Sequence, residues 1–396
     1  MIFEFATAQR ILFGCGTLRE LPGLIPGTGR RVALITGSSA ERVAPVFKAL
    51  KECGAEPAAF SVSGEPTTDR INTLARQARE QQCDMVVAFG GGSVIDAGKA
   101  IAALLTNTRD LMDYLEVIGK GEPLSEDPAP CIAIPTTAGT GAEVTRNSVL
   151  LSPEHNVKVS MRHPKMLPTA AIVDPELTLS MPPEVTASTG LDAFIQLLEA
   201  FVSAKANPLT DGICREGIRR VSRSLHRAYK DGTDLEARTG MAFGSLCGGL
   251  ALSNAGLGAV HGFAGPLGGM FKAPHGMVCA SLLPAVMKAN IEALEERAAE
   301  NPALEKYREV AVMLTGSGNA RLSDGLDWVN ALCEDMPVSG LEAFGVTAGD
   351  IPDIVEKARQ ASSMKGNPIQ LTNDELAGIL ADSLESPIHG NSGIDL

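Results

Sequence analysis

The first half of the chain alternates short apolar runs with longer amphipathic ones. Strand-like apolar runs lie at 31–36, 58–62, 84–90 and 131–135. Between them, apolar residues recur at helical spacing over 41–54, 69–83 and 93–107. The runs at 84–90 and 131–135 lack polar alternation, which is typical of strands that are covered on both faces. This order of elements predicts a parallel sheet with helices on both sides.

The second half changes to a helical pattern that continues almost to the end of the chain. We therefore place a boundary after residue 181, with an α/β domain over 1–181 and an all-α domain over 182–396. A length of 396 residues also suits two domains of ordinary size. A ligand is expected in the cleft between the two halves.

Two glycine-rich turns follow buried strands of the first half. In FGGGSVIDAGKA, Gly91 and Gly92 open a predicted helix, Ser93 can cap it, and Asp96 has capping-box spacing. Bare amides at such a helix start form an anion site that suits a pyrophosphate. The alternative is a tight turn without a ligand, because the motif is neither GxGxxG nor a Walker sequence.

The second turn, IPTTAGTGAEVTRN, adds hydroxyl donors to the same prediction. Thr136, Thr137 and Thr140 lie among glycines directly after the strand at 131–135. Because parallel strands end at the same edge of a sheet, both turns should converge on one crevice. This convergence favours nucleotide binding more strongly than either turn alone.

Three polar residues stand out in the helical half. His261 and His275 lie among small and apolar residues, and Asp192 lies in an apolar helical stretch. A single histidine there would be interpreted as a buried core residue whose hydrogen bonds are satisfied. Asp192 alone would be interpreted as an acid in the first turn of a helix, where the helix dipole favours a negative charge. Two imidazoles and one carboxylate together are also a common ligand set for a divalent metal.

Composition narrows the class of protein. Hydrophobic residues make up 44% and charged residues 20%, as in a soluble globular enzyme. The net charge of −13 repels phosphate backbones, so we expect no nucleic-acid partner. We see neither a signal peptide nor an apolar run of about 18 residues that would suggest a membrane span. Eight scattered cysteines without a CxxC pair fit reduced thiols, so we expect a cytoplasmic protein.

These motifs together resemble the iron-containing (group III) alcohol dehydrogenase family. The matching stretches span nearly the whole chain: ILFGCGTLRELP, EPTTDRI, GGGSVIDAGKAIA, IPTTAGTGAEVT, AIVDPELT, GLDAFIQLLEAFVSAKANPLTD and NAGLGAVHGFAGPLGGMFKAPHG. The resemblance implies a Rossmann-like, dehydroquinate-synthase-like α/β domain that binds NAD or NADP, and a helical domain that binds metal. It also implies hydride transfer between the nicotinamide and a small alcohol or aldehyde.

The resemblance assigns the metal ligands. Three family ligands of Fe²⁺ or Zn²⁺ match Asp192, His261 and His275, which would form the catalytic centre. Gln196 stands where relatives place a further histidine. Asp192 and Gln196 share one helical face, so both would look into the site. An amide oxygen is a weaker donor than imidazole, so we expect metal to bind with weaker retention. Gly265 also replaces a histidine of many relatives, which removes a proton path through that side chain.

The resemblance assigns the cofactor contacts as well. Together with the turns, they are Gly37, Gly91, Gly92, Ser93, Asp96, Thr136, Thr137, Thr140, Thr145, Lys158, Leu177 and Thr178. Asn147 matches a position that lines the substrate pocket. Many NAD-preferring relatives carry an aspartate just after the first strand, where this chain has Gly37, Ser38 and Ser39, so NADP stays open beside NAD.

Three other readings remain open. A metal-independent, maleylacetate-reductase-like enzyme would not need the aspartate and two histidines that this chain retains. A dehydroquinate-synthase-like lyase should have basic residues for a phosphorylated substrate, and no such cluster lies beside these motifs. A nucleotide-binding protein without catalysis would explain the lost histidine ligand. Since relatives are often dimers and the helical faces are apolar, we expect a homodimer.

Overall fold

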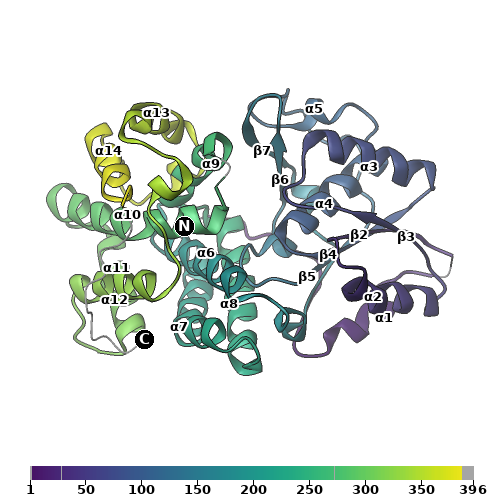
Figure 1. The fold of residues 1–396 in the computed structure, drawn as a ribbon, viewed down its shortest axis with the longest axis horizontal. Helices are drawn as coiled ribbons and strands as arrows, with labels where there is room; N and C mark the ends of the chain where they lie inside the picture. The colour runs from purple at the N-terminus through teal and green to yellow at the C-terminus, as the bar shows by residue number, and fades with distance from the viewer. Residues whose placement is uncertain (1, 28, 272, 386–396) are drawn as a thin grey trace. The chain divides into compact units, whose positions relative to one another are not determined.

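The computed structural model describes residues 2–27, 29–271 and 273–385 of the chain (Figure 1). Contacts divide the chain into two compact units, and we describe each by itself. The α/β unit comprises Ala6–Thr137 and Gly141–Leu179. The helical unit begins at Ser180 and also takes in Ala138–Thr140 and the stretch that ends at Phe5. The predicted single boundary after residue 181 does not include these two additional segments. Ligand binding in a cleft between the two halves stays a prediction.

The α/β unit is built on a parallel sheet of six strands. They are β1 (Ile11–Phe13), β2 (Arg31–Thr36), β3 (Glu56–Ser61), β4 (Met85–Gly90), β5 (Cys131–Pro135) and β8 (Ala170–Val173), in the order β1-β8-β5-β4-β2-β3. The helices are α1 (Leu21–Leu24), α2 (Ala40–Glu52), α3 (Thr68–Glu80), α4 (Gly92–Thr106) and α5 (Leu111–Tyr114). Every neighbouring pair in this sheet is parallel, which confirms the predicted fold class.

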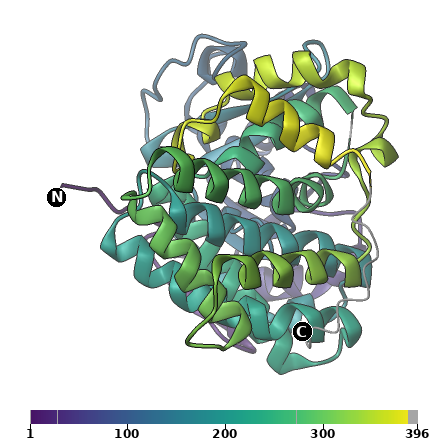
Figure 2. The ribbon, with the colours of Figure 1, turned by 90° about the vertical axis from the view of Figure 1, so that its left-hand side faces the viewer.

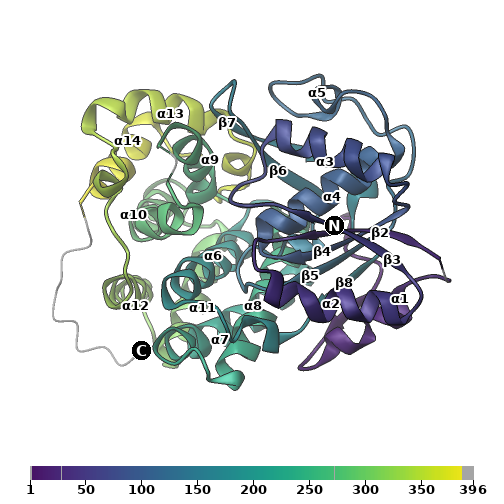
Figure 3. The same cartoon turned by 45° about the vertical axis from the view of Figure 1, so that its right-hand side comes forward.

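Two separate cores hold the sheet, one on each face. Along β2, Val32 and Leu34 pack with α1 and α2, whereas Ala33 and Ile35 pack with α3 and α4. Figure 3 shows these two pairs of helices on opposite sides of the strands. Since successive side chains of a strand point to opposite faces, a strand covered on both faces must be apolar throughout. This explains the uninterrupted apolar runs in the sequence.

The sequence reading missed several strands of this unit. Strands β1 and β8 are short, and each has only three or four residues to carry a pattern. Strands β6 (Asn147–Ser152) and β7 (Val157–Arg162) form a separate antiparallel pair. Their polar residues gave no clear strand signal, because this pair packs only part of its surface against the core.

The helical unit contains no strand within its described residues. Its longer helices are α6 (Pro183–Val202), α7 (Pro208–Lys230), α8 (Leu235–Ala255), α9 (Ala259–Phe271), α10 (His275–Arg297), α11 (Pro302–Thr315), α12 (Leu322–Asp335), α13 (Ile351–Gln360) and α14 (Asn373–Asp382). Figure 2 shows them packed side by side, in teal through yellow. One large apolar core joins all nine. Its centre is α6, where 15 of 20 residues are buried.

Within the described part of this unit, two helices have the length and apolar content of a membrane span. They are α6 and α10, and the sharply bent pair α8 and α9 passes the same test when taken together. Within the most apolar stretch of each, 83% of α6 and 67% of α10 is buried inside the protein. Burial in a large helical core accounts for this composition. The expectation that no membrane is involved stays a prediction.

Candidate metal centre and glycine-rich turns

An aspartate, two histidines and a cysteine meet inside the helical unit. Asp192 comes from α6, His261 from α9, and His275 and Cys279 from the first turns of α10; their ligand atoms all lie within 4.8 Å of one another. Oδ1 of Asp192 is 3.3 Å from Nε2 of His261 and 3.7 Å from Nε2 of His275. The three predicted ligands are therefore brought together from residues up to 83 positions apart.

Close helix packing sets this geometry. A β-carbon at Gly276 would lie 2.2 Å from the backbone oxygen of Ser188, so only glycine lets α10 approach α6 this closely. Gly276 directly follows His275, and Ser188 precedes Asp192 by one helical turn. The contact thus fixes the separation between two of the clustered side chains.

The cluster contains buried polar atoms that the protein leaves unsatisfied. Among the described residues, Oδ1 of Asp192, Nε2 of His261 and Oε1 of Gln196 have no hydrogen-bond partner. The side chains of Asp192 and His261 are only 3% and 7% exposed, so water cannot readily replace the missing partners. An unpartnered buried polar atom costs about 1–3 kcal/mol. Oδ1 of Asp192 and Nε2 of His261 lie 3.3 Å apart, and this pair fits a divalent cation that accepts their lone pairs.

Glu199 holds His261 in place, and sequence reasoning missed it. Its carboxylate accepts a hydrogen bond from Nδ1 of His261 at 2.7 Å and another from the backbone amide of Val260 at 2.7 Å. With one proton held on Nδ1, Nε2 is the nitrogen that faces Asp192 and that can offer its lone pair to a cation. Glu199 lies seven residues after Asp192 on an otherwise apolar helix, and this spacing was the available signal.

The electrostatics of the cluster favour opposite charges. Burial acts to lower the pKa of His261, but the carboxylates of Asp192 and Glu199 outweigh it and raise that pKa to about 10. Burial acts to raise the pKa of Asp192, but the two neighbouring imidazoles hold that pKa below its usual value. A cation that binds here must therefore displace a proton from His261.

Gln196 and Gly265 mark the two departures seen in the sequence. The amide nitrogen of Gln196 donates a hydrogen bond to Oδ2 of Asp192 at 3.0 Å, so this side chain positions the carboxylate. Coordination by Gln196 itself stays a prediction. A β-carbon at Gly265 would meet no atom within 4 Å among the described residues, so there is open space where a larger side chain would stand.

In the α/β unit, the two glycine-rich turns lie side by side. Gly90 pairs with Pro135 in the sheet, and the amide of Thr136 donates to the backbone oxygen of Gly90 at 2.9 Å. A β-carbon at Gly91 would touch the Thr137 side chain at 3.4 Å. The beginnings of the two turns are thus neighbours at one edge of the sheet, and a common crevice that binds a nucleotide stays a prediction.

Two details predicted for this helix start are wrong. Gly91 is the N-cap of α4 and no side chain caps it, so Ser93 lies inside the first turn instead of capping it. Asp96 does not form a capping box either. Its Oδ1 pairs with Nζ of Lys99 at 2.9 Å, and its Oδ2 accepts from the amide of Val149 at 3.0 Å. Asp96 therefore links α4 to β6. Residue spacing along α4 could not reveal this contact with a distant part of the chain.

Lys99 is a buried anchor that the sequence reading passed over. Its ammonium donates to the backbone oxygen of Ala142 at 2.9 Å, to Oγ1 of Thr145 at 2.9 Å and to the backbone oxygen of Asn147. Two predicted ligand contacts, Thr145 and Asn147, are therefore engaged with Lys99. The anchor holds the second glycine-rich turn against α4.

The other predicted cofactor residues are spread over the two units. Gly37 borders a hollow of about 590 Å³ between α2 and β3. Lys158 pairs with Glu65, the Leu177 carbonyl accepts from Arg42, and the Thr178 hydroxyl donates to the Pro175 carbonyl. Thr140 packs with the helical unit. Their contacts with a dinucleotide stay predictions.

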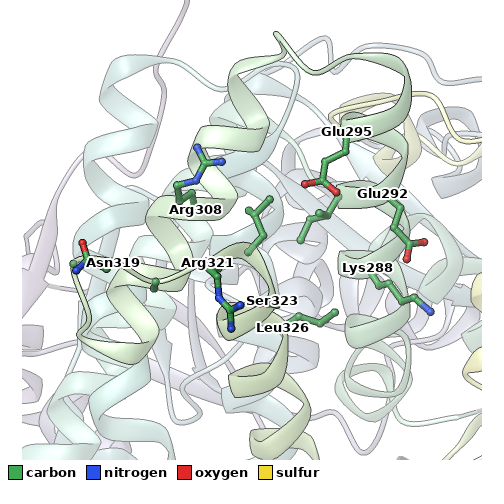
Figure 4. A pocket seen from close by; sticks show the side chains of 12 residues that line it. Lys288, Glu292, Glu295, Arg308, Asn319, Arg321, Ser323 and Leu326 are labelled. Carbon is green, nitrogen blue, oxygen red and sulfur yellow. The ribbon is translucent and has the colours of Figure 1, made fainter.

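A larger hollow lies elsewhere in the helical unit, between α10, α11 and α12 (Figure 4). It encloses about 710 Å³ and is lined by charges of both signs, including Lys288, Glu292 and Arg308. Arg308 pairs with Glu305 on its own helix, and Arg321 with Asp324. Both arginines of the lining therefore already have a carboxylate partner on their own helix or its first turn.

Comparison with known proteins agrees with the fold. The family description "Iron-containing alcohol dehydrogenase" matches residues 8–175, and "Fe-containing alcohol dehydrogenase family, C-terminal" matches residues 186–384. Alcohol dehydrogenase 4 of Saccharomyces cerevisiae (strain YJM789) is 34% identical over 381 residues, which cover 94% of this chain and 96% of that protein.

Solved structures give the same result. A crystal structure of 1,3-propanediol oxidoreductase superposes with a TM-score of 0.88 at 32% identity, covering 97% of this chain and 100% of the other. Sulfoacetaldehyde reductase from Bifidobacterium kashiwanohense, solved in complex with NAD⁺, superposes with a TM-score of 0.84 at 29% identity, covering 97% and 99%.

The fold and the cluster define an oxidoreductase with a two-part α/β and helical architecture. The chain belongs to the iron-containing alcohol dehydrogenase family, and it is an alcohol dehydrogenase by class.

Proposed function

We propose that this alcohol dehydrogenase depends on a divalent metal and transfers hydride between NAD or NADP and a small alcohol or aldehyde. One observation carries the proposal: the unpartnered atoms of Asp192 and His261 meet Nε2 of His275 in a largely buried cluster. Without a cation there, only the ion-pair contact of Asp192 with His261 at 3.3 Å would offset the cost of burying these atoms.

Asp192, His261 and His275 would hold the cation, and their charge suits Fe²⁺ or Zn²⁺. When bound, such a cation supplies Lewis acidity toward a substrate oxygen, while the nicotinamide exchanges the hydride. Glu199 keeps the Nδ1 proton of His261, and Gln196 orients the carboxylate of Asp192. The side chain of His275 is 39% exposed, which leaves the cluster open on that side.

The paired glycine-rich turns support the dinucleotide part of the proposal. Gly91 at the start of α4 lies beside the Thr137 side chain, and the Thr136 amide bonds to the Gly90 carbonyl, so the two turns can serve one pyrophosphate. The NAD⁺ bound by sulfoacetaldehyde reductase favours NAD in a similar fold. Since no carboxylate follows β2, NADP is proposed as an alternative, and comparison of kcat/KM for the two cofactors decides between them.

Chelation tests the metal dependence. A chelator should abolish alcohol oxidation, and Fe²⁺ or Zn²⁺ should restore it in the wild-type protein but not in Asp192→Asn. Activity that survives complete metal removal would instead identify a metal-independent, maleylacetate-reductase-like enzyme. Turnover without net change in cofactor redox state would identify a lyase.

We further propose that the protein acts as a cytoplasmic homodimer without a nucleic-acid or membrane partner. Its net charge of −13 argues against a nucleic-acid partner, and its eight cysteines, none in a CxxC pair, support a cytoplasmic location. Sedimentation equilibrium would measure the oligomeric state, and a monomer would overturn that part.

A further inference from the structure

The cluster in the helical unit holds a fourth donor that the family resemblance does not assign. Cys279 lies one helical turn after His275 on α10, and its side chain is fully buried. Its Sγ is 3.8 Å from Nε2 of His275. It also lies within 4.8 Å of the ligand atoms of Asp192 and His261.

These separations fit a tetrahedral ion. Bonds of about 2.0–2.3 Å place neighbouring ligand atoms of a tetrahedral site roughly 3.3–3.8 Å apart. The three measured separations are 3.3 Å, 3.7 Å and 3.8 Å, and they join all four side chains in one chain of contacts. Among the other pairs of ligand atoms, the longest separation would have to shorten by about 1 Å. Rotation of the side chains in the metal-bound state supplies this change.

Gln196 is less suited to the fourth position. Its amide nitrogen is committed to Oδ2 of Asp192 at 3.0 Å. Its carbonyl oxygen lies on the side of Gly248 in α8, where a β-carbon would be 3.2 Å away. A neutral amide is also a weaker donor than a thiolate toward Zn²⁺.

We propose that Cys279, and not Gln196, supplies the fourth protein ligand, giving an Asp-His-His-Cys site. This inference rests on the proposed function, because it concerns the same cation. The cysteine compensates for the histidine that this chain lacks at position 196. Coordination turns the thiol into a thiolate and releases its proton to solvent, with no change of oxidation state.

The donor set has a consequence for metal choice. Thiolate is a soft ligand that favours Zn²⁺, whereas oxygen donors favour harder cations. A site with Cys279 bound should therefore prefer Zn²⁺ over Fe²⁺ more strongly than a site of carboxylate and imidazole alone. Four protein ligands would still permit catalysis, because catalytic zinc sites sometimes expand to five-coordinate in the transition state.

Cobalt substitution tests the ligand directly. Full-length metal-free protein is titrated with Co²⁺, and its absorption is recorded without substrate or cofactor. A thiolate ligand produces an intense near-ultraviolet charge-transfer band, in addition to the weak visible bands of any tetrahedral Co²⁺. The wild-type protein and Gln196→Ala should show the intense band, and Cys279→Ala should keep only the visible bands.

Matched controls make the result decisive. Cys333→Ala removes another buried cysteine of the helical unit and should leave the band unchanged. Cys279→Ser, which keeps the side-chain volume, guards against misfolding of the alanine variant, and circular dichroism checks both. Competition with a chromophoric chelator should give about 100-fold weaker Zn²⁺ binding for Cys279→Ala, with a smaller loss for Fe²⁺.

The outcomes separate this inference from the proposed function. One Co²⁺ bound per wild-type chain without the charge-transfer band would overturn Cys279 as a ligand and leave the metal enzyme intact. A band that persists in Cys279→Ala would also overturn it. Failure to bind any Co²⁺ or Zn²⁺ would overturn the metal-dependent function and this proposal together.

Discussion

The carboxylate of Glu199 lies 2.7 Å from Nδ1 of His261, and both side chains are almost fully buried. This pair decides which nitrogen of the imidazole carries a proton. Because the carboxylate accepts from Nδ1, Nε2 is the nitrogen that faces Asp192, 3.3 Å away, and that a cation would bind. Glu199, which is outside the predicted set of metal ligands, thereby orients the imidazole of His261, which would bind the metal.

Replacing Glu199 should weaken metal binding. In Glu199→Gln the amide can donate to Nδ1, which moves the imidazole proton to Nε2 and blocks its lone pair. We expect Zn²⁺ affinity to fall by about 10–100-fold, as measured by competition with a chelator. The exposed Glu356→Gln serves as a control and should bind metal like the wild type. Unchanged affinity in Glu199→Gln would show that the Glu199 contact does not orient His261.

Separating α6 from α10 should damage the same site. Gly276→Ala places a methyl group 2.2 Å from the backbone oxygen of Ser188, so the two helices must move apart. We expect a loss of stability of about 1–3 kcal/mol together with weaker metal binding. Gly378→Ala on α14 is the matched control, since its β-carbon would meet no atom within 4 Å in the described part of the chain.

The two glycine substitutions should change the free energy of unfolding in opposite directions. In Gly378→Ala, the lost backbone freedom of the unfolded chain should stabilise the protein by about 0.4–1 kcal/mol. Denaturant unfolding and metal titration of both variants measure the contrast. Equal effects of Gly276→Ala and Gly378→Ala on metal affinity would refute the packing argument.

Removing the buried ammonium of Lys99 should destabilise the α/β unit. Lys99→Met leaves the carboxylate of Asp96 and two backbone oxygens without their cation. We expect the free energy of unfolding to drop by about 3–5 kcal/mol in urea titrations. Lys48→Met removes a surface lysine that is 75% exposed and should change stability by no more than about 0.5 kcal/mol.

Glu143 should make stability depend on pH. Burial raises the pKa of its carboxyl from 4.5 to about 7, although its own backbone and Lys99 oppose this. Between these two values the folded state binds more protons than the unfolded state, so stability must fall as pH rises. Ionising the buried acid should cost about 3 kcal/mol by the upper end of that window.

The variant Glu143→Gln removes this titration. It should be more stable than the wild type at about pH 8 and nearly equal at about pH 5, as followed by denaturant unfolding. Parallel stability curves for the two proteins across this range would mean that Glu143 does not titrate there.

The sequence by itself determined the secondary structure wherever the hydrophobic residues of a segment followed one clear pattern, that of a helix or that of a buried strand. The uninterrupted apolar runs of β4 and β5 could only be strands covered on both faces, and β5 was predicted with its observed bounds. Asp192, His261 and His275 were also visible, because polar groups on apolar helices need a reason to be buried. The short β1 and the hairpin of β6 and β7 carried too little pattern to be recognised.

Tertiary structure alone decided which partners these residues meet. Asp96 fitted a capping box by spacing, but it turned to Lys99 and β6, since a buried ion pair outweighs a local cap. Cys279 joined the cluster because Gly276 lets α10 approach α6, and Glu199 became the partner of His261 only where α6 meets α9. Periodicity reports how one helix is buried, whereas a ligand set depends on the distances between three helices, and packing fixes those distances.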